Sequence, residues 1–363
     1  MLAGMAKPRA RRPAKARSGR EAAAVAAPAS AEQRALLASI LADPADKKAR
    51  LVYADLLQEQ GDPRGEFIAL QCARAELPDG APGTPELDAQ TAALLAGHKA
   101  AWTAFGEAKG ARWEFRRGFV EKLSLDASAL LANADAIFAA EPIEELSVWK
   151  IEQSELRHGR SRLAPILELP LGRVRRLSLA RCALVEEDFE DLAAATTLGA
   201  VEVLDLSNRG SEAIPLAPLA HATSLPRLRE FKIGGCMMGD DAMAALARAP
   251  TLRFARLIAP RNDLTAAACE AIAAATWAPG LVHLDLSSNE LLSDAGLRAL
   301  AGSPHLGALR SLALSYCGLG PDAADLVLGS PVLAGLEHLD LSSNLSAEER
   351  DRIRAVLGDR LVG

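Results

Sequence analysis

From Val120 to Asn344 the hydrophobic positions of this chain recur at a nearly constant interval. Nine times an apolar residue is followed by further apolar residues three and five positions later. The copies begin at Val120, Ile143, Val174, Val201, Leu228, Phe254, Leu281, Leu309 and Leu336. The last seven starts lie 26 to 28 residues apart. A period of this length predicts a solenoid, in which each copy packs against its neighbours.

Each copy is expected to hold one short strand and one helix. The first apolar residue is counted as position one. Positions four and six then point into the core, and positions three and five point to the opposite, solvent-facing side. Between the strands the apolar spacing predicts helices at Asp240–Ala249, Thr265–Ala275, Ser293–Ala301 and Pro321–Leu328. In these helices we expect the inward residues to be Leu246, Ile272, Leu297 and Leu326.

Position nine, where the strand ends, carries a second regularity. It is asparagine at Asn262, Asn289 and Asn344, and cysteine at Cys182, Cys236 and Cys317. An asparagine amide can pair with both a donor and an acceptor of a buried turn, and a small thiol fits the same slot. We therefore expect structural roles for these cysteines rather than nucleophilic or metal-binding ones. Two copies depart from the pattern, with Ile151 at position nine of one and Arg209 at position nine of another.

Residues 31–119 have a different pattern. Apolar residues at helical spacing predict three helices over residues 31–77, with turns at Asp43-Pro44 and Asp62-Pro63. A further helix is expected over Leu87–Trp102. Trp113, Phe115 and Phe119 then alternate in a segment that we expect to be extended. Because a solenoid must cover the open end of its core, we assign residues 31–119 this capping role.

The helical region resembles the bacterial repeat-companion domain that precedes leucine-rich repeats. The resemblance rests on Leu51-Val52-Tyr53-Ala54-Asp55, Gly61-Asp62-Pro63-Arg64-Gly65-Glu66-Phe67-Ile68, Leu70-Gln71, Trp102 and Arg116-Arg117-Gly118-Phe119-Val120. The resemblance implies an association with repeat arrays. It does not imply an enzymatic activity.

Residues 120–345 resemble the leucine-rich repeat superfamily. The period, the helical returns and the mixed asparagine and cysteine at position nine are most similar to its ribonuclease-inhibitor-like subclass. This resemblance implies an α/β solenoid with a parallel sheet on its concave face, used for protein recognition. Ser346 and Glu349 form a capping box, and Ile353, Val356, Leu357 and Leu361 predict one final helix in residues 346–363.

Charge and cysteine content bear on partners and location. Residues 1–20 hold seven basic side chains and no acidic one, although the whole chain has a net charge of −6. We expect residues 1–30 to be a disordered basic tail, either solvated or holding nucleic acid or an anionic surface; a signal peptide fits poorly. The five cysteines are an odd number and show no paired spacing, which favours a reducing, cytoplasmic setting. No apolar run has membrane-spanning length.

The predicted concave face supplies the candidate site, because its exposed columns carry aromatic and arginine residues of the kind enriched at binding hot spots. The candidates are Trp149, Lys150, Arg176, Arg181, Lys232, Arg256, Arg261, His283, Tyr316 and His338. Basic residues dominate the middle copies, where Glu145 and Glu230 join them, and Asp285 and Asp340 lie in the last copies. We expect a protein partner that is acidic opposite the middle repeats.

Enzymatic alternatives find little support in the sequence. His283 with Asp285 and His338 with Asp340 could bind a divalent metal, yet aspartate here also fits the repeat pattern. A helix-turn-helix and a phosphate-binding loop in residues 31–77 are disfavoured by charge and by the missing Gly-Lys-Ser/Thr ending. Ran-type GTPase-activating proteins use similar repeats, so regulation of a small GTPase is the alternative function. We predict no catalytic residue, no metal and no cofactor.

Overall fold

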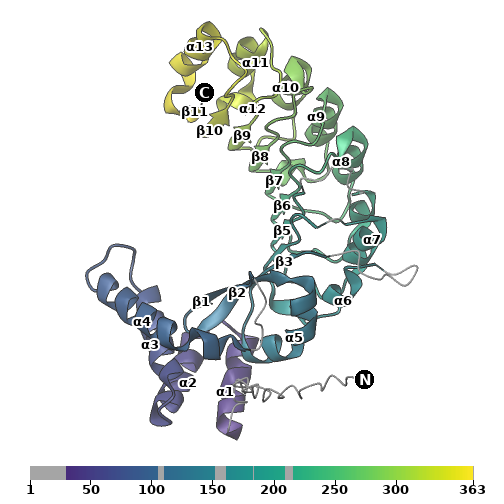
Figure 1. Ribbon diagram of the computed structural model, residues 1–363. Coiled ribbons are helices and arrows are strands. Elements are labelled where there is room, and N and C mark those ends of the chain that lie inside the picture. Colours follow the sequence, from purple (N-terminus) through teal and green to yellow (C-terminus); the bar gives the residue numbers. More distant parts are fainter. Residues whose placement is uncertain (1–29, 105–109, 152–160, 183, 209–215, 363) are drawn as a thin grey trace, which may run out of the picture.

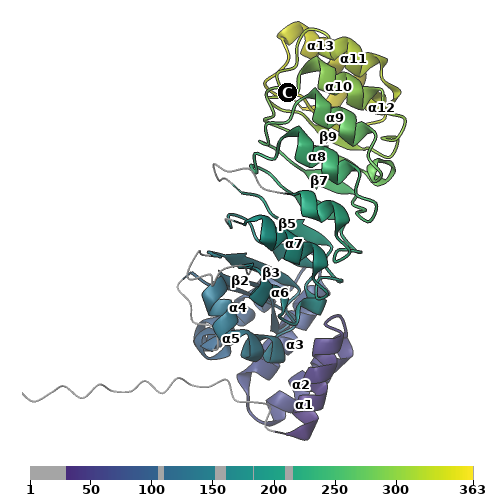
Figure 2. The ribbon, with the colours of Figure 1, turned by 90° about the vertical axis from the view of Figure 1, so that its right-hand side faces the viewer.

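The computed structural model describes residues 30–104, 110–151, 161–182, 184–208 and 216–362. These residues form an arc with strands along the inner side and helices along the outer side (Figure 1). Figure 2 looks onto the outer side, where the helices of successive repeats are stacked. The tail of residues 1–29 and Arg209 lie outside the described residues. No helix among the described residues is long and apolar enough to span a membrane.

The strands form one sheet in chain order, and each predicted copy contributes one of β2 to β10. The strands are β1 (Arg112–Arg116), β2 (Phe119–Asp126), β3 (Glu145–Trp149), β4 (Arg176–Ser178), β5 (Val203–Asp205), β6 (Glu230–Lys232), β7 (Arg256–Ile258), β8 (His283–Asp285), β9 (Ser311–Ala313), β10 (His338–Asp340) and β11 (Leu361–Val362). β1 pairs with β2 antiparallel, and every later pair is parallel. The predicted α/β solenoid with a parallel concave sheet is therefore confirmed.

The helices alternate with these strands after an N-terminal helical region. They are α1 (Ala31–Ala42), α2 (Lys47–Glu59), α3 (Pro63–Ala75), α4 (Thr84–Trp102), α5 (Ala127–Ala140), α6 (Ala164–Leu167), α7 (Glu186–Ala194), α8 (Gly239–Ala247), α9 (Ala266–Ala273), α10 (Ser293–Ala301), α11 (Ala323–Gly329), α12 (Pro331–Ala334) and α13 (Ala347–Leu357). The predicted repeat helices correspond to α8 to α11. Leu326 is an exception to the predicted inward set, because it is only partly buried and Val327 takes the core position.

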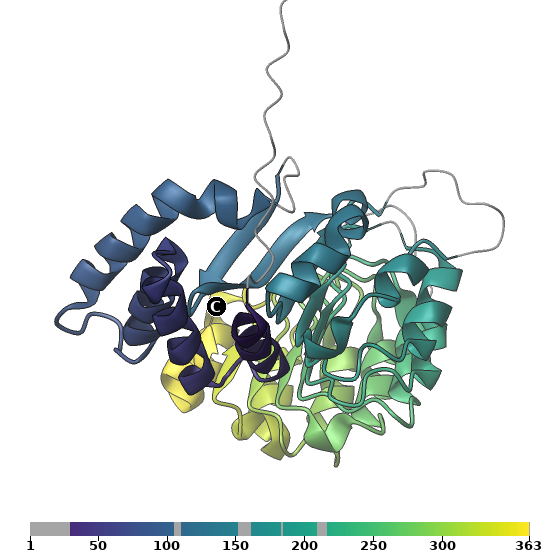
Figure 3. The ribbon, with the colours of Figure 1, turned by 90° about the horizontal axis from the view of Figure 1, so that it is seen from below.

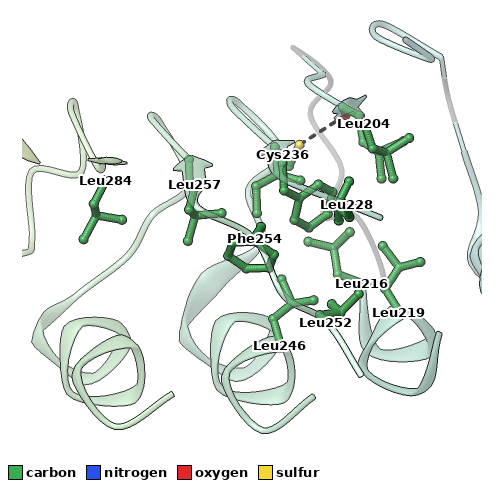
Figure 4. Packing of buried hydrophobic residues seen from close by; sticks show 14 of the residues in the cluster. Leu204, Leu216, Leu219, Leu228, Cys236, Leu246, Leu252, Phe254, Leu257 and Leu284 are labelled. Atoms are coloured by element: carbon green, nitrogen blue, oxygen red, sulfur yellow. Dashed lines mark hydrogen bonds between the residues drawn. The ribbon is translucent and has the colours of Figure 1, made fainter. Parts of the chain in front are cut away.

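Leucine side chains from both layers fill the space between sheet and helices. Leu257 and Leu284 point from their strands toward the helix side, and Leu246 approaches from α8 (Figure 4). Trp277 is buried and its indole N–H donates to the Leu246 carbonyl at 2.9 Å. Its ring lies 4.6 Å from that of Phe254. Full burial of each such side chain stabilises the fold by about 1.5–3 kcal/mol. The buried residues of successive repeats belong to one continuous core.

Position nine forms a hydrogen-bonded ladder between repeats. The Asn262 amide donates to the Ile233 carbonyl of the preceding copy, and its Oδ1 accepts the Cys236 backbone N–H. The Cys236 thiol donates in the same way to the Leu206 carbonyl at 3.5 Å. Cysteine therefore replaces the donor of asparagine, whereas its sulfur is only a weak acceptor compared with the amide oxygen. The structural role expected for these residues agrees with this geometry, and burial raises the pKa of the Cys236 thiol to about 11.

The helical region packs against the first two strands through buried ion pairs. Arg64 donates to both carboxylate oxygens of Glu141, whose Oε2 also accepts the Val120 N–H. Arg50 lies 2.7 Å from Glu121, and both side chains are buried. Seen from below, these helices lie beside the first strands at the N-terminal end of the arc (Figure 3). Charged contacts thus join the helical region to the solenoid, which the apolar pattern alone did not predict.

The segment predicted to be simply extended is a β-hairpin. β1 and β2 are joined by Arg117 and Gly118, which both have positive φ. A Cβ on Gly118 would lie 2.6 Å from the Ile68 Cα, so the tight approach of α3 requires glycine. Phe115 joins Phe67 and Trp102 in the core beneath this hairpin. The predicted aromatic covering of the first repeat is therefore present, with a different backbone.

The C-terminal prediction is correct for the capping box and wrong for part of the apolar stripe. Ser346 and Glu349 form the box at the start of α13, and Ile353 and Leu357 are buried. Val356, however, is 63% exposed, and Leu361 belongs to β11. The helix ends because Gly358 adopts positive φ and turns the chain back toward the sheet. A parallel strand beside β10, together with α13, therefore ends the described sheet.

Candidate binding surface on the concave sheet

The sheet register places the predicted residues in two straight columns on the concave face. The position-three column runs through Lys122, Glu145, Arg176, Val203, Glu230, Arg256, His283, Ser311 and His338. Lys232, Asp285 and Asp340 lie in the position-five column. All of these side chains are exposed or partly exposed, whereas the intervening leucines are buried. The concave face is thus one continuous surface that is mostly polar, with Val203, Ile258 and Ala313 among its apolar members.

Ion pairs across the strands neutralise much of the predicted basic sector. Glu230 pairs with Lys232 at 3.0 Å and with Arg256 at 3.2 Å, and Arg176 lies 3.9 Å from Glu145. Burial tends to raise the pKa of Glu230, but these cations outweigh it and lower the pKa below its ordinary value. The middle of the face therefore alternates in charge more than the sequence indicated.

The β-hairpin extends this charged face beyond the predicted residues. Arg116 bonds Glu114 on its own strand and Glu145 on β3. Lys122 lies 3.0 Å from Glu114. This cluster was not predicted, because the sequence did not indicate that β1 pairs with β2. The alternation of charged with aromatic residues in 112–116 was the available signal.

Position eight has a backbone feature that the sequence did not reveal. Lys150, Arg181, Arg261 and Tyr316 have φ between 52° and 63°. All four side chains are exposed. Glycine occupies the same position at Gly235, with a φ of 66°. The candidates at position eight therefore emerge from a turn at the end of each strand, and Lys150 lies 5.3 Å from the ring of its neighbour Trp149.

The histidine and aspartate pairs lie two strands apart, as the spacing predicted. Ser311 separates His283 from His338 in the register. Asp285 accepts the backbone N–H of Ser287 at 2.9 Å, which explains its recurrence as a structural residue. Burial lowers the pKa of His283, and Arg256 adds to this effect. Within the described residues no group of three or more histidine, cysteine or acidic side chains is placed to hold a metal ion.

A groove lies where the strands of five successive repeats, β4 to β8, end. Its cavity volume is about 480 Å³. It is lined by Ala180, Arg181, Ser207, Asn208, Gly234, Gly235, Pro260, Arg261 and Ser288. These residues occupy positions seven and eight, so the groove runs along the solenoid across the strand ends. Two of the predicted binding residues, Arg181 and Arg261, are thereby brought into one hollow.

Comparisons with known proteins add the following. Among solved structures, an internalin (InlF) from Listeria monocytogenes is 19% identical, with 65% of this chain and 69% of that chain covered and a TM-score of 0.38. A structure of the yeast Rad7–Elc1 complex is 15% identical, with coverages of 84% and 88% and a TM-score of 0.39. For InlP of L. monocytogenes the identity is 13%, the coverages are 69% and 64%, and the TM-score is 0.35. Nothing about function follows from these similarities.

The comparison with curated proteins gave no match. The family model described as Leucine Rich repeat matches residues 281–301. That stretch contains β8, the position-nine residue Asn289 and α10. The same strand position, register and helical return recur along the sheet on both sides of it. Residues 281–301 therefore match a leucine-rich repeat, and the same strand, register and helical return recur in the neighbouring copies, so the described repeats form a solenoid of this kind.

Proposed function

We propose that this chain is a non-catalytic interaction protein that binds a protein partner on the concave face of its solenoid. The observation that carries the proposal is the unbroken register, which gathers charged and aromatic side chains from many repeats into one surface. Trp149 and Tyr316 are amphipathic aromatics of the kind that anchor interfaces, and both are accessible there. The partner is acidic where it faces the groove and of mixed charge over the ion-paired strands.

We further infer the finer classification of the chain. Residues 31–119 act as a repeat-companion domain, residues 120–345 as a ribonuclease-inhibitor-like solenoid, and residues 346–363 as a C-terminal cap. Arg64 and Gln71, which belong to the companion motif, both contact Gly118 of the hairpin, so the motif residues lie at the junction of the two units. A strand–helix unit of 26 to 28 residues supports the subclass.

A capture experiment with matched variants tests the proposed function. The concave variant carries Trp149→Ala, Arg176→Glu and Arg256→Glu. The control carries Arg248→Glu at the C-cap of α8 and Arg298→Glu on α10. Intact protein and both variants are compared in lysate of the source cells, with thermal melts to show that each is folded.

The concave variant should lose a salt-resistant partner that the intact protein and the control retain. Retention of that partner by a folded concave variant would refute binding on this face. GTP hydrolysis accelerated within the captured complex would instead favour regulation of a small GTPase.

A further inference from the structure

The groove at the strand ends has an unbalanced charge. Among the residues that the structure describes, its lining holds two arginines and no acidic residue. On the neighbouring sheet face, in contrast, Lys232 and Arg256 each pair with Glu230. Neither Arg181 nor Arg261 forms an ion pair with any residue that the structure describes. Two positive charges that face a hollow favour an anionic ligand, because its charges lose less by desolvation there than in an uncharged cleft.

The repeat geometry fixes the spacing of these charges. Arg181, Asn208, Gly235 and Arg261 occupy position eight of four successive strands, whose backbone bonds continue to this position. Strands lie about 4.8 Å apart, so the Cα atoms of Arg181 and Arg261 are separated by about 14 Å. An extended peptide advances about 3.3 Å per residue, and residues four apart are about 13 Å apart on the same face. Two acidic residues with this spacing match the two arginines.

Between the arginines the groove is lined by Ser207, Asn208, Gly234, Gly235 and Pro260, and the two glycines have no side chain. Gly234 and Gly235 leave room over the middle strand. A Cβ on Gly234 would lie 3.1 Å from Cγ of Pro260, so glycine lets the adjacent proline close the wall. The residue midway between two acidic residues points to the same face of an extended peptide. Its side chain can therefore enter the hollow, where proline and glycine favour an apolar group.

We propose that the groove at the strand ends binds an extended acidic segment of a partner protein, in which an apolar residue lies midway between two acidic residues four apart. This proposal rests on the proposed function and deepens it, because it adds a specific subsite to the binding surface. Arg181 and Arg261 contact the two carboxylates, and the hollow over Gly234 and Gly235 takes the apolar side chain. The segment runs along the solenoid and crosses the strand ends.

Two isomeric, fluorescein-labelled peptides test the proposal by fluorescence anisotropy. One has the sequence Ser-Glu-Ser-Leu-Ser-Glu-Ser, and the other has the same residues with adjacent glutamates, Ser-Glu-Glu-Leu-Ser-Ser-Ser. The variants are Arg181→Ser and Arg261→Ser, singly and together, and Gly235→Asn, with Arg248→Ser at the C-cap of α8 as the control. Serine is suitable because Ser288 and Ser343 adopt the same backbone conformation at position eight, and asparagine tolerates positive φ.

The peptide with spaced glutamates should bind about fivefold or more tightly than its isomer. Each single arginine variant should weaken it about threefold and the double variant about tenfold, as expected for accessible charge pairs. Gly235→Asn should abolish binding by filling the hollow, and the control should leave it unchanged. Equal affinity for both isomers, no binding at millimolar peptide, or equal displacement by oligothymidylate or inorganic phosphate would overturn the proposal.

The two proposals fail in different ways. If the spaced peptide shows no preference but partner capture still depends on the concave face, only the groove is refuted. If the peptide preference holds but the concave variant retains the partner, the concave site is refuted and the groove remains.

Discussion

Replacing Asn289 tests whether the position-nine ladder holds neighbouring repeats together. Its side chain is buried, its Oδ1 accepts the backbone N–H groups of Asn262 and Leu264, and its Nδ2 donates to the carbonyls of Ala259 and Leu286. Asn289→Ala removes all four bonds. A buried donor left without a partner costs about 1–3 kcal/mol, so losing partners for two N–H groups should lower the free energy of unfolding by about 4 kcal/mol.

Asn289→Cys is the matched control, because cysteine occupies this position in three other copies. Its thiol can still donate to the Ala259 carbonyl, as the Cys236 thiol does to Leu206, but it cannot replace the Oδ1 acceptor well. We expect it to be less destabilising than alanine, by roughly half of the alanine effect. Urea unfolding followed by circular dichroism gives both free energies, and hydrogen exchange should show lost protection at the Asn262 amide. A loss under 1 kcal/mol for alanine, or equal losses for the two variants, would refute the reasoning.

Three further predictions concern the junction of the helical region and the thiols. Arg64→Met leaves the buried Glu141 carboxylate unpaired and should cost about 4 kcal/mol in urea unfolding, whereas Arg64→Met with Glu141→Gln should recover at least half; equal losses would contradict the ion-pair account. Gly118→Ala should cost about 3 kcal/mol, because alanine must adopt positive φ and its Cβ meets Ile68; an unchanged melting temperature would contradict this. Burial raises the pKa of the Cys236 thiol to about 11. The contribution of the buried, protonated thiol to stability is therefore complete below the ordinary thiol pKa and is lost as pH rises through 11. Rapid reaction of the native protein with a disulfide reagent at pH 8 would refute this burial.

The solenoid was predictable because its core residues recur at a regular interval along the sequence. The positions that Leu284 and Leu286 occupy are apolar in every copy. Burial of one strand face requires this pattern, whatever the protein binds. The asparagine at position nine was also predictable, since a buried turn needs both a donor and an acceptor. Because positions three and five alternate with the buried positions, the columns of the concave face were also predictable from the sequence.

What the sequence did not reveal depends on contacts between distant residues. The pairing of Arg64 with Glu141 joins residues 77 positions apart and has no local signature. At position eight only Gly235 is a glycine, and the lysine, arginine, serine and tyrosine that have positive φ in other copies do not signal this conformation as glycine does. The pairing of Arg256 with Glu230 depends on side-chain conformation as well as register. The charge of the site was therefore less accurately predicted than its location.

Photo-crosslinking from the concave face is the most direct test of the central claim. A photoreactive benzoylphenylalanine replaces Trp149 or Tyr316, where an aromatic side chain already fits, and Arg248 at the C-cap of α8 serves as the outer-side control. After irradiation in the source cells, both concave positions should yield the same covalent protein adduct, and the outer position should not yield it. Adduct formation at Arg248 with none at Trp149 or Tyr316 would show that the partner binds the outer side and would contradict the account.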